Sequence, residues 1–151
     1  MTTIKDKYSL GIIIGLTANI IRNIFNYIVY QLNFTQYLPR QIAAATFIPL
    51  AKIDSLIGII IGFCADYGIA IFFSLSIVYL LDITGDDFAI LKGLSIGLLY
   101  WLLLFGLLLR FGLSRINPSD LGTNLIFLFN HLLLGIIVAV MVVRYKAKYF
   151  R

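Results

Sequence analysis

The chain has 151 residues, of which 61% are hydrophobic and 13% are charged, and its formal net charge is +5. Soluble domains average roughly 45–50% apolar and about 25% charged residues, and a soluble fold of this length could not bury so much apolar surface. The composition excludes an ordinary soluble domain. It predicts an all-α integral membrane protein in which residues 1–151 form one domain.

Four apolar stretches are long enough to cross a bilayer, because a hydrocarbon core about 30 Å thick needs about 20 helical residues. Asp54 and Ser55 can cap the second helix, residues 84–87 can start the third, and Asn117-Pro118 precedes the fourth. The two later connections are short and predict antiparallel neighbours in a four-helix bundle. The predicted spans run over about residues 8–32, 55–81, 88–111 and 119–143.

The connection over residues 33–54 is different, because residues 41–51 are apolar but far too few to cross a membrane. Pro39 precedes this piece and Pro49 interrupts it. We expect either a helix in the outer interface or a short re-entrant segment.

The distribution of lysine and arginine outside the spans predicts the orientation. One side carries Arg40, Lys52, Arg110 and Arg115. The other side is richer, so we expect a multi-pass membrane protein with both termini in the cytoplasm. The basic C-terminal end predicts contact with anionic lipid headgroups rather than with nucleic acid. The richer side holds Lys5, Lys7, Lys92, Arg144, Lys146, Lys148 and Arg151.

A short phrase occurs twice: GIIIGLTAN at residues 11–19 and GIIIGFCAD at residues 58–66. Each copy places two glycines four residues apart on one helix face, and the third span repeats this spacing. Such spacing lets helix backbones approach closely in a membrane. Whether the phrase records an internal duplication stays open. The glycines predicted to pack helices are Gly11, Gly15, Gly58, Gly62, Gly93 and Gly97.

Three of the four spans contain an ionisable residue at a similar depth. Counted from the outer ends at 1.5 Å per residue, Arg22, Asp66 and His131 all lie roughly 15–18 Å deep. Asp66 is the only acidic residue deep inside a predicted span, so we predict an Arg22–Asp66 ion pair whose hydrogen bonds are completed by asparagines. The predicted buried polar centre comprises Arg22, Asp66, His131, Asn19, Asn23, Asn26 and Asn130.

Two interpretations of this centre remain open. The ion pair is either a static link that orients two helices or part of an ion or proton site. His131 is either a hydrogen-bonded packing residue or a titrating relay. One histidine and the single Cys64 cannot supply a metal site, and the sequence has no glutamate and no catalytic motif. We therefore expect no metal, no cofactor and no enzymatic activity.

The layout resembles a group of small four-span membrane proteins of Gram-positive bacteria, the YqhR-like proteins. The similarity lies in GIIIG at the start of the first span, the polar stretch before the second, KGLSIGLLYW in the third and HLLLGIIVAV in the fourth. The resemblance implies a four-span fold in the plasma membrane of a bacterium and assigns no functional residue.

The leading functional expectation is a non-enzymatic membrane component that assembles with itself or with another membrane protein. The alternative is a small homodimeric transporter or channel that couples to protons through Asp66 or His131. The two differ in a structural property: a static centre should be dry and fully paired, whereas a transporter should have a cavity that reaches Asp66. In both cases the lipid bilayer is the surrounding partner.

Overall fold

The computed structural model describes residues 6–116, 118 and 120–149. Over these residues it is helical and contains no strand, and four helical stretches are long and apolar enough to cross a membrane. The predicted all-α architecture with four long helices is confirmed. The elements are α1 (Lys7–Gln31), α2 (Pro39–Phe47), the 3-10 turn η1 (Leu50–Lys52), α3 (Leu56–Thr84), α4 (Ala89–Trp101), the π-helix η2 (Leu102–Leu108) and α5 (Leu121–Tyr149).

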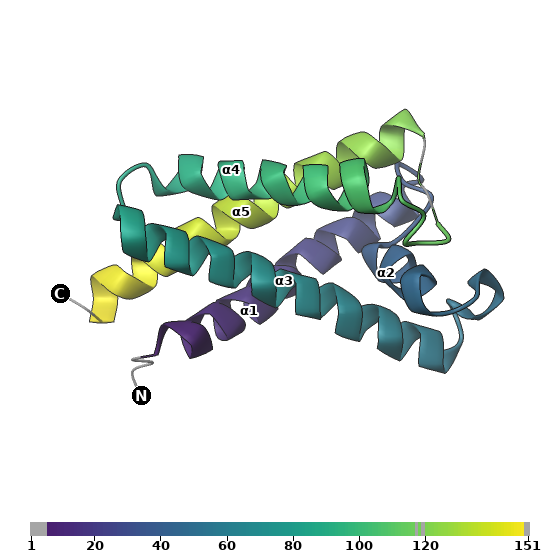
Figure 1. Cartoon of the computed structure of the whole chain (residues 1–151), viewed down its shortest axis with the longest axis horizontal. Coiled ribbons are helices and arrows are strands. Elements are labelled where there is room, and N and C mark those ends of the chain that lie inside the picture. The colour runs from purple at the N-terminus through teal and green to yellow at the C-terminus, as the bar shows by residue number, and fades with distance from the viewer. Residues whose placement is uncertain (1–5, 117, 119, 150–151) are drawn as a thin grey trace.

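The four long helices alternate in direction along the bundle (Figure 1). The start of α1 and the end of α5 lie at the same end of the molecule, and α2 lies at the opposite end. α1 packs mainly against α3, and α4 packs mainly against α5. The apolar core between them includes Ile14, Phe73, Ile77, Leu134 and Val138.

Side-chain caps fix the starts of three long helices. Asp6 accepts a hydrogen bond from the backbone N–H of Ser9 at 2.7 Å and begins α1. Ser55 caps α3, as predicted, by accepting from Gly58 N at 3.2 Å. Before α5, the Oδ1 atom of Asp120 accepts from Thr123 N at 2.7 Å. These acceptors satisfy backbone donors that a helix start leaves free. Asn117, predicted near this point, lies outside the described residues.

The start of α4 differs from the prediction. Residues 84–87 do not cap it; the helix follows Phe88, which has φ 54° and makes no side-chain cap. Gly85, with φ 82°, ends α3 in a conformation that favours glycine. Lys92 reaches back from the first turn of α4 and donates to the carbonyl of Gly85 at 2.9 Å. The turn is therefore held from the α4 side.

Ion pairs tie the helix ends together at the end of the bundle where α1 starts. Lys7 Nζ lies 2.6 Å from Asp82 Oδ2 of α3, and Lys146 Nζ of α5 lies 2.8 Å from Asp86 Oδ1 in the α3–α4 turn. These pairs are partly exposed, so each contributes little to stability by itself. They place the basic residues of both ends of the chain beside the acidic turn.

The six predicted packing glycines all contact other parts of the same chain. A Cβ atom at Gly15 would lie 2.9 Å from the carbonyl oxygen of Ala70, and one at Gly97 would lie 2.5 Å from that of His131. Gly11 faces Leu75 of α3, and Gly93 faces Gly135 of α5. The remaining two do not join two spans: Gly58 abuts Lys52 in η1, and Gly62 abuts Arg40 in α2.

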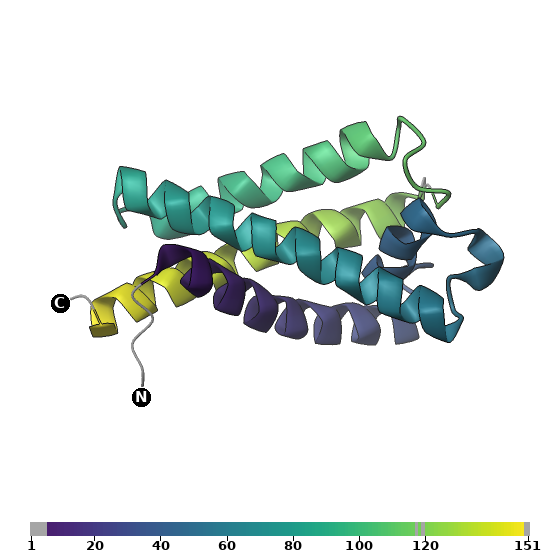
Figure 2. The ribbon, with the colours of Figure 1, turned by 60° about the horizontal axis from the view of Figure 1, so that its bottom comes forward.

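α3 and α4 remain in contact as far as the last turn of α4. There, the hydroxyls of Ser76 and Tyr100 lie 3.0 Å apart, and the rings of Phe73 and Tyr100 pack edge to face. Farther along, the two helices diverge (Figure 2). α2 packs against α3 at this wider end.

α2 itself is a nine-residue helix that begins at Pro39 and ends before Pro49. Its inner face buries Ile42, Ala44 and Ala45. The loop after η2 holds it from the other side, since Ser114 Oγ donates to the carbonyl of Ile42 at 3.0 Å. The segment predicted as interfacial or re-entrant thus packs as part of the bundle.

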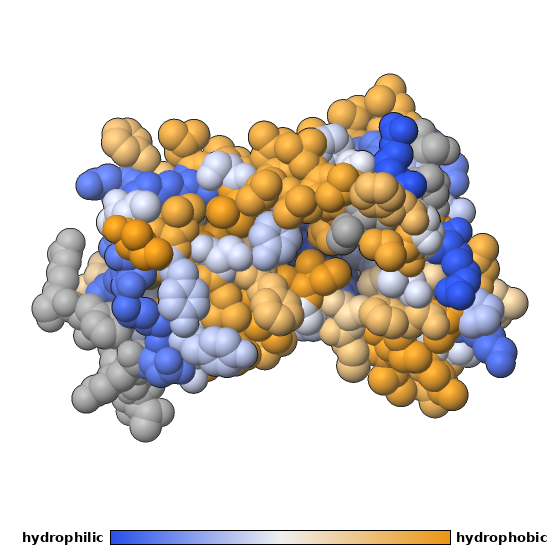
Figure 3. All heavy atoms as spheres, in the orientation of Figure 1, coloured by the Kyte–Doolittle hydropathy of each residue, from blue (hydrophilic) through white to orange (hydrophobic). Residues whose placement is uncertain are grey.

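The surface agrees with the predicted class of protein. One face of the molecule is mainly hydrophobic along its middle, with hydrophilic residues gathered toward the two ends (Figure 3). Large apolar side chains such as Ile24, Phe72 and Ile83 are exposed. An apolar belt between polar ends is the pattern that a bilayer requires.

Candidate functional site

A buried ion pair joins α1 to α3. Nη2 of Arg22 donates to Oδ1 of Asp66, and the two residues are only 4% and 5% exposed. The other carboxylate oxygen, Oδ2, accepts from the side-chain amides of Asn19 and Asn23, both at 2.9 Å. Asp66 therefore receives three hydrogen bonds, which compensate for the removal of its charge from water.

A second set of hydrogen bonds connects this pair to α5. The Asn26 amide donates to the backbone carbonyl of Arg22 at 3.0 Å. The Asn130 amide of α5 in turn donates to Asn26 Oδ1 at 2.5 Å. Both asparagines are 1% exposed. The structure thus brings six of the seven predicted residues into one network across α1, α3 and α5.

His131 is the seventh predicted residue, and it is buried without joining that network. Its Nδ1 atom lies 2.7 Å from the carbonyl oxygen of Phe127 on the same helix. A carbonyl only accepts, so Nδ1 carries the hydrogen, and Nε2 is an acceptor whenever the ring is neutral. The imidazole also packs edge-on against Phe105, with ring centroids 5.7 Å apart. Within the described chain, no hydrogen bond joins it to Arg22 or Asp66.

The network is not fully paired. Among the described residues, three buried polar atoms of the network lack a hydrogen-bond partner: Asn19 Oδ1, Arg22 Nε and Asn130 Oδ1. The buried hydroxyl oxygen of Ser74, outside the network, lacks one as well. Most buried polar groups in folded proteins are satisfied, so these four atoms are exceptions, and of their residues only Arg22 lines the cavity described next.

A cavity of about 400 Å³ lies beside the network. Arg22, Asp66 and His131 all line it, so the predicted residues of three helices share one space. The other walls are largely apolar and come from α2, α3, η2, the following loop and α5. They include Ile42, Ala43, Phe47, Ala65, Gly68, Ile69, Phe72, Leu104, Phe105, Leu109 and Phe127.

The π-helix η2 forms one wall of this cavity. Leu109 N donates to the carbonyl of Leu104 at 3.1 Å, a bond across five residues rather than the four of an α-helix. Leu104 and Phe105 of this wider turn line the cavity. π-helical segments are frequent at functional sites. The sequence did not predict this feature, because nothing in the run of leucines distinguishes a π-helix from an α-helix.

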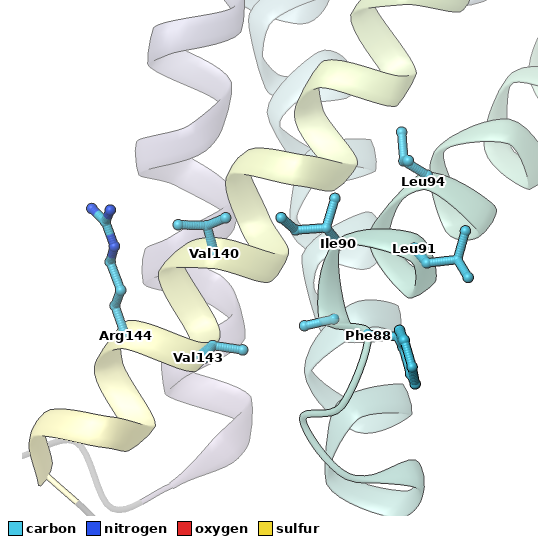
Figure 4. Close-up of a pocket in the computed structure, with 8 residues that line it drawn as sticks. Phe88, Ile90, Leu91, Leu94, Val140, Val143 and Arg144 are labelled. Carbon is cyan, nitrogen blue, oxygen red and sulfur yellow. The ribbon is translucent and has the colours of Figure 1, made fainter.

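A second hollow is an open groove between the start of α4 and the end of α5, with a volume of about 700 Å³ (Figure 4). Leu91 and Leu94 line it from α4, Val140 and Val143 line it from α5, and Arg144 is its one charged lining residue. Arg144 points away from the α4 side chains in Figure 4. The groove offers apolar contact area but no second polar group that could orient a ligand.

No group of three metal-ligating side chains occurs within the described residues. Cys64 is exposed on α3 and stands outside the network. Comparisons with protein-family models, curated protein sequences and solved structures find no match for the chain. The resemblance to the YqhR-like group stays a prediction.

Proposed function

We propose that this chain is a non-enzymatic, multi-pass protein of the bacterial plasma membrane that binds a lipid-soluble molecule in the cavity beside Arg22 and Asp66. The observation that carries the proposal is this cavity, which Arg22, Asp66 and His131 line and where the guanidinium of Arg22 has a donor without a partner among the described residues. Its volume lies in the range of ligand pockets, about 300–1,000 Å³, and mostly apolar walls with a few polar groups are typical of them.

The expectation of self-assembly through glycine faces loses its main support. All six predicted packing glycines contact the same chain, so their faces are already covered within the monomer. Association with a second copy or a partner needs another surface. Ligand binding needs none, because the cavity already exists.

Proton-coupled transport by a homodimer is the second candidate. It is favoured by the same cavity, which reaches both Asp66 and His131. Against it stand the three hydrogen bonds that Asp66 accepts, since a proton carrier needs a carboxylate that can exchange its partners. The apolar walls also offer few groups that could guide water.

The experiment is native mass spectrometry of the full chain purified from membranes in mild detergent. Gly68 lines the cavity, and a Cβ atom there meets nothing within 4 Å, so Gly68→Leu fills space without a backbone clash. Gly106→Leu is the matched control, because Gly106 is equally open and does not line the cavity. We expect a small molecule bound to the wild type and the control and lost from Gly68→Leu.

A wild-type protein that carries no bound molecule, or one that Gly68→Leu retains in full, contradicts the proposal. Proton flux in proteoliposomes tests the second candidate. Flux that depends on Asp66 would make transport the better explanation of the cavity.

A further inference from the structure

We infer that the cavity binds the head of a lipid-soluble quinone, an uncharged ring with carbonyl acceptors and an apolar tail. This inference rests on the proposed function and names the chemical class of its ligand. Four properties of the cavity support it: unused hydrogen-bonding groups, a balanced charge, aromatic walls and an exposed apolar rim.

The polar side of the cavity has both a donor and an acceptor to spare. A guanidinium has several N–H donors, and in the described structure Arg22 uses only Nη2, toward Asp66. His131 lines the same space and uses only Nδ1 among the described residues, which leaves Nε2 as an acceptor. A quinone carbonyl accepts from the guanidinium, and a hydroxyl of the reduced form donates to His131.

The charge at this site favours an uncharged ligand. Arg22 is already matched by Asp66, so the pair has no net charge to offer. An anion in the cavity would meet the Asp66 carboxylate, and a cation would meet the Arg22 guanidinium. Burying either ion without a free partner is costly, whereas a neutral carbonyl needs only one N–H donor.

The walls suit a flat ring. Phe105 and Phe127 are stacked with centroids 4.8 Å apart and an angle of 24° between their planes, and both line the cavity. Phe47 and Phe72 line it as well, but they are 65% and 66% exposed and therefore form its rim. Aromatic rings pack favourably in offset stacks. A ring stacked on the free face of Phe105 or Phe127 can leave its tail in the bilayer through the rim.

Trp101 provides the measurement, because it is the only tryptophan in the chain. It packs against a cluster in which Ile42, Leu109 and Phe127 also line the cavity. A decyl-substituted benzoquinone, added to the full chain in mild detergent, should quench its fluorescence in a saturable manner. Gly68→Leu should weaken this binding at least about tenfold, and Gly106→Leu should bind like the wild type.

Two competing ligands test whether the cavity prefers a quinone or binds any apolar molecule. Decylbenzene has the tail and a ring without carbonyls, and decanoate has the tail with a negative charge. Neither should displace the quinone at an equal concentration. If decylbenzene displaces it equally well, the quinone assignment is wrong while the proposed function stands. If decanoate binds more tightly than the quinone, the argument from charge is wrong.

Unsaturable quenching, or quenching that both glycine variants leave unchanged, would contradict the inference and the proposed function together. The melting temperatures of the variants establish that they are folded. Should Gly68→Leu fail to fold, Ala65→Leu replaces it, because Ala65 also lines the cavity from α3.

Discussion

Asn19 donates a hydrogen bond to Asp66 with 2.9 Å between Nδ2 and Oδ2, and these two residues end the two copies of the repeated nine-residue phrase. One copy thus supplies an amide donor, and the other supplies the carboxylate that accepts it. Two carboxylates would repel each other, and two amides would leave Arg22 without a counter-ion. The glycines of the two copies have different partners, so the repeat does not produce a symmetric packing of the two helices.

The ion pair predicts a specific pattern of stability losses. Asp66→Asn or Arg22→Gln alone should lower the free energy of unfolding by about 3–5 kcal/mol, because each leaves an unmatched buried charge. The double variant should recover much of this loss, since it buries no net charge. Denaturation by SDS in mixed micelles measures all three variants against the wild type.

The exposed pair Lys7–Asp82 serves as the control for that cycle. Asp82→Asn should change the free energy of unfolding far less than Asp66→Asn does, because solvent screens this pair. A double variant no more stable than the worse of the two single variants would show that Arg22 and Asp66 act independently.

Close packing of α4 on α5 predicts a strong effect of a single methyl group. Gly97→Ala should destabilise the chain by about 1–3 kcal/mol, because its Cβ would lie 2.5 Å from the backbone oxygen of His131. Gly106→Ala, where the added atom meets nothing within 4 Å, should cause no loss. Thermal unfolding in detergent distinguishes the two, and equal melting temperatures would refute the close helix contact.

The proposed orientation can be tested with single cysteines. In a Cys64→Ser background, a cysteine at Lys52 should react with a membrane-impermeant maleimide on intact spheroplasts. One at Ala147 should react only after permeabilisation, because it lies with the basic residues expected in the cytoplasm. Both positions are exposed in the structure. The reverse labelling pattern would invert the topology.

The cap of α5 predicts a dependence of stability on pH. The backbone N–H of Thr123 lowers the pKa of Asp120 below its ordinary value of 3.8. A carboxyl whose pKa is lower in the folded state than in the unfolded state stabilises the folded state at pH values above the unfolded pKa. This stabilisation is lost as the pH falls through the folded pKa. The difference in melting temperature between the wild type and Asp120→Asn should therefore shrink below about pH 4.

Asp120→Ala removes the cap itself and should cost about 1 kcal/mol at neutral pH. The melting temperatures of the wild type and Asp120→Asn could also differ by the same amount at neutral and acidic pH. That result would show that the Asp120 carboxylate does not stabilise the helix through its charge.

The sequence predicted the features that follow from local pattern. Long apolar runs indicate helices, and Ser55 indicates a cap. Because Asp66 is the only acidic residue deep inside a span, it is the partner that the sequence indicates for Arg22. The prediction failed where several segments must be placed together. The cavity depends on the divergence of α3 from α4, on the insertion of α2, and on the π-helix beside Phe105.

Some signals for the missed features are visible afterwards. Pro39 and Pro49 bound a short helix, and its small residues Ala44 and Ala45 allow close contact with neighbouring segments. Gly68 places no side chain in the cavity. None of these residues specifies by itself that a space remains open, because a void results from the whole packing arrangement and not from a motif.

The distance along the chain between the two members of the ion pair has a consequence for synthesis. Asp66 follows Arg22 by 44 residues, so the ribosome completes α1 well before its counter-ion exists. Three asparagines and an arginine make α1 costly to release into lipid alone. We therefore expect the insertion machinery to keep α1 beside the exit path until α3 arrives, so that the two helices enter the bilayer as a pair.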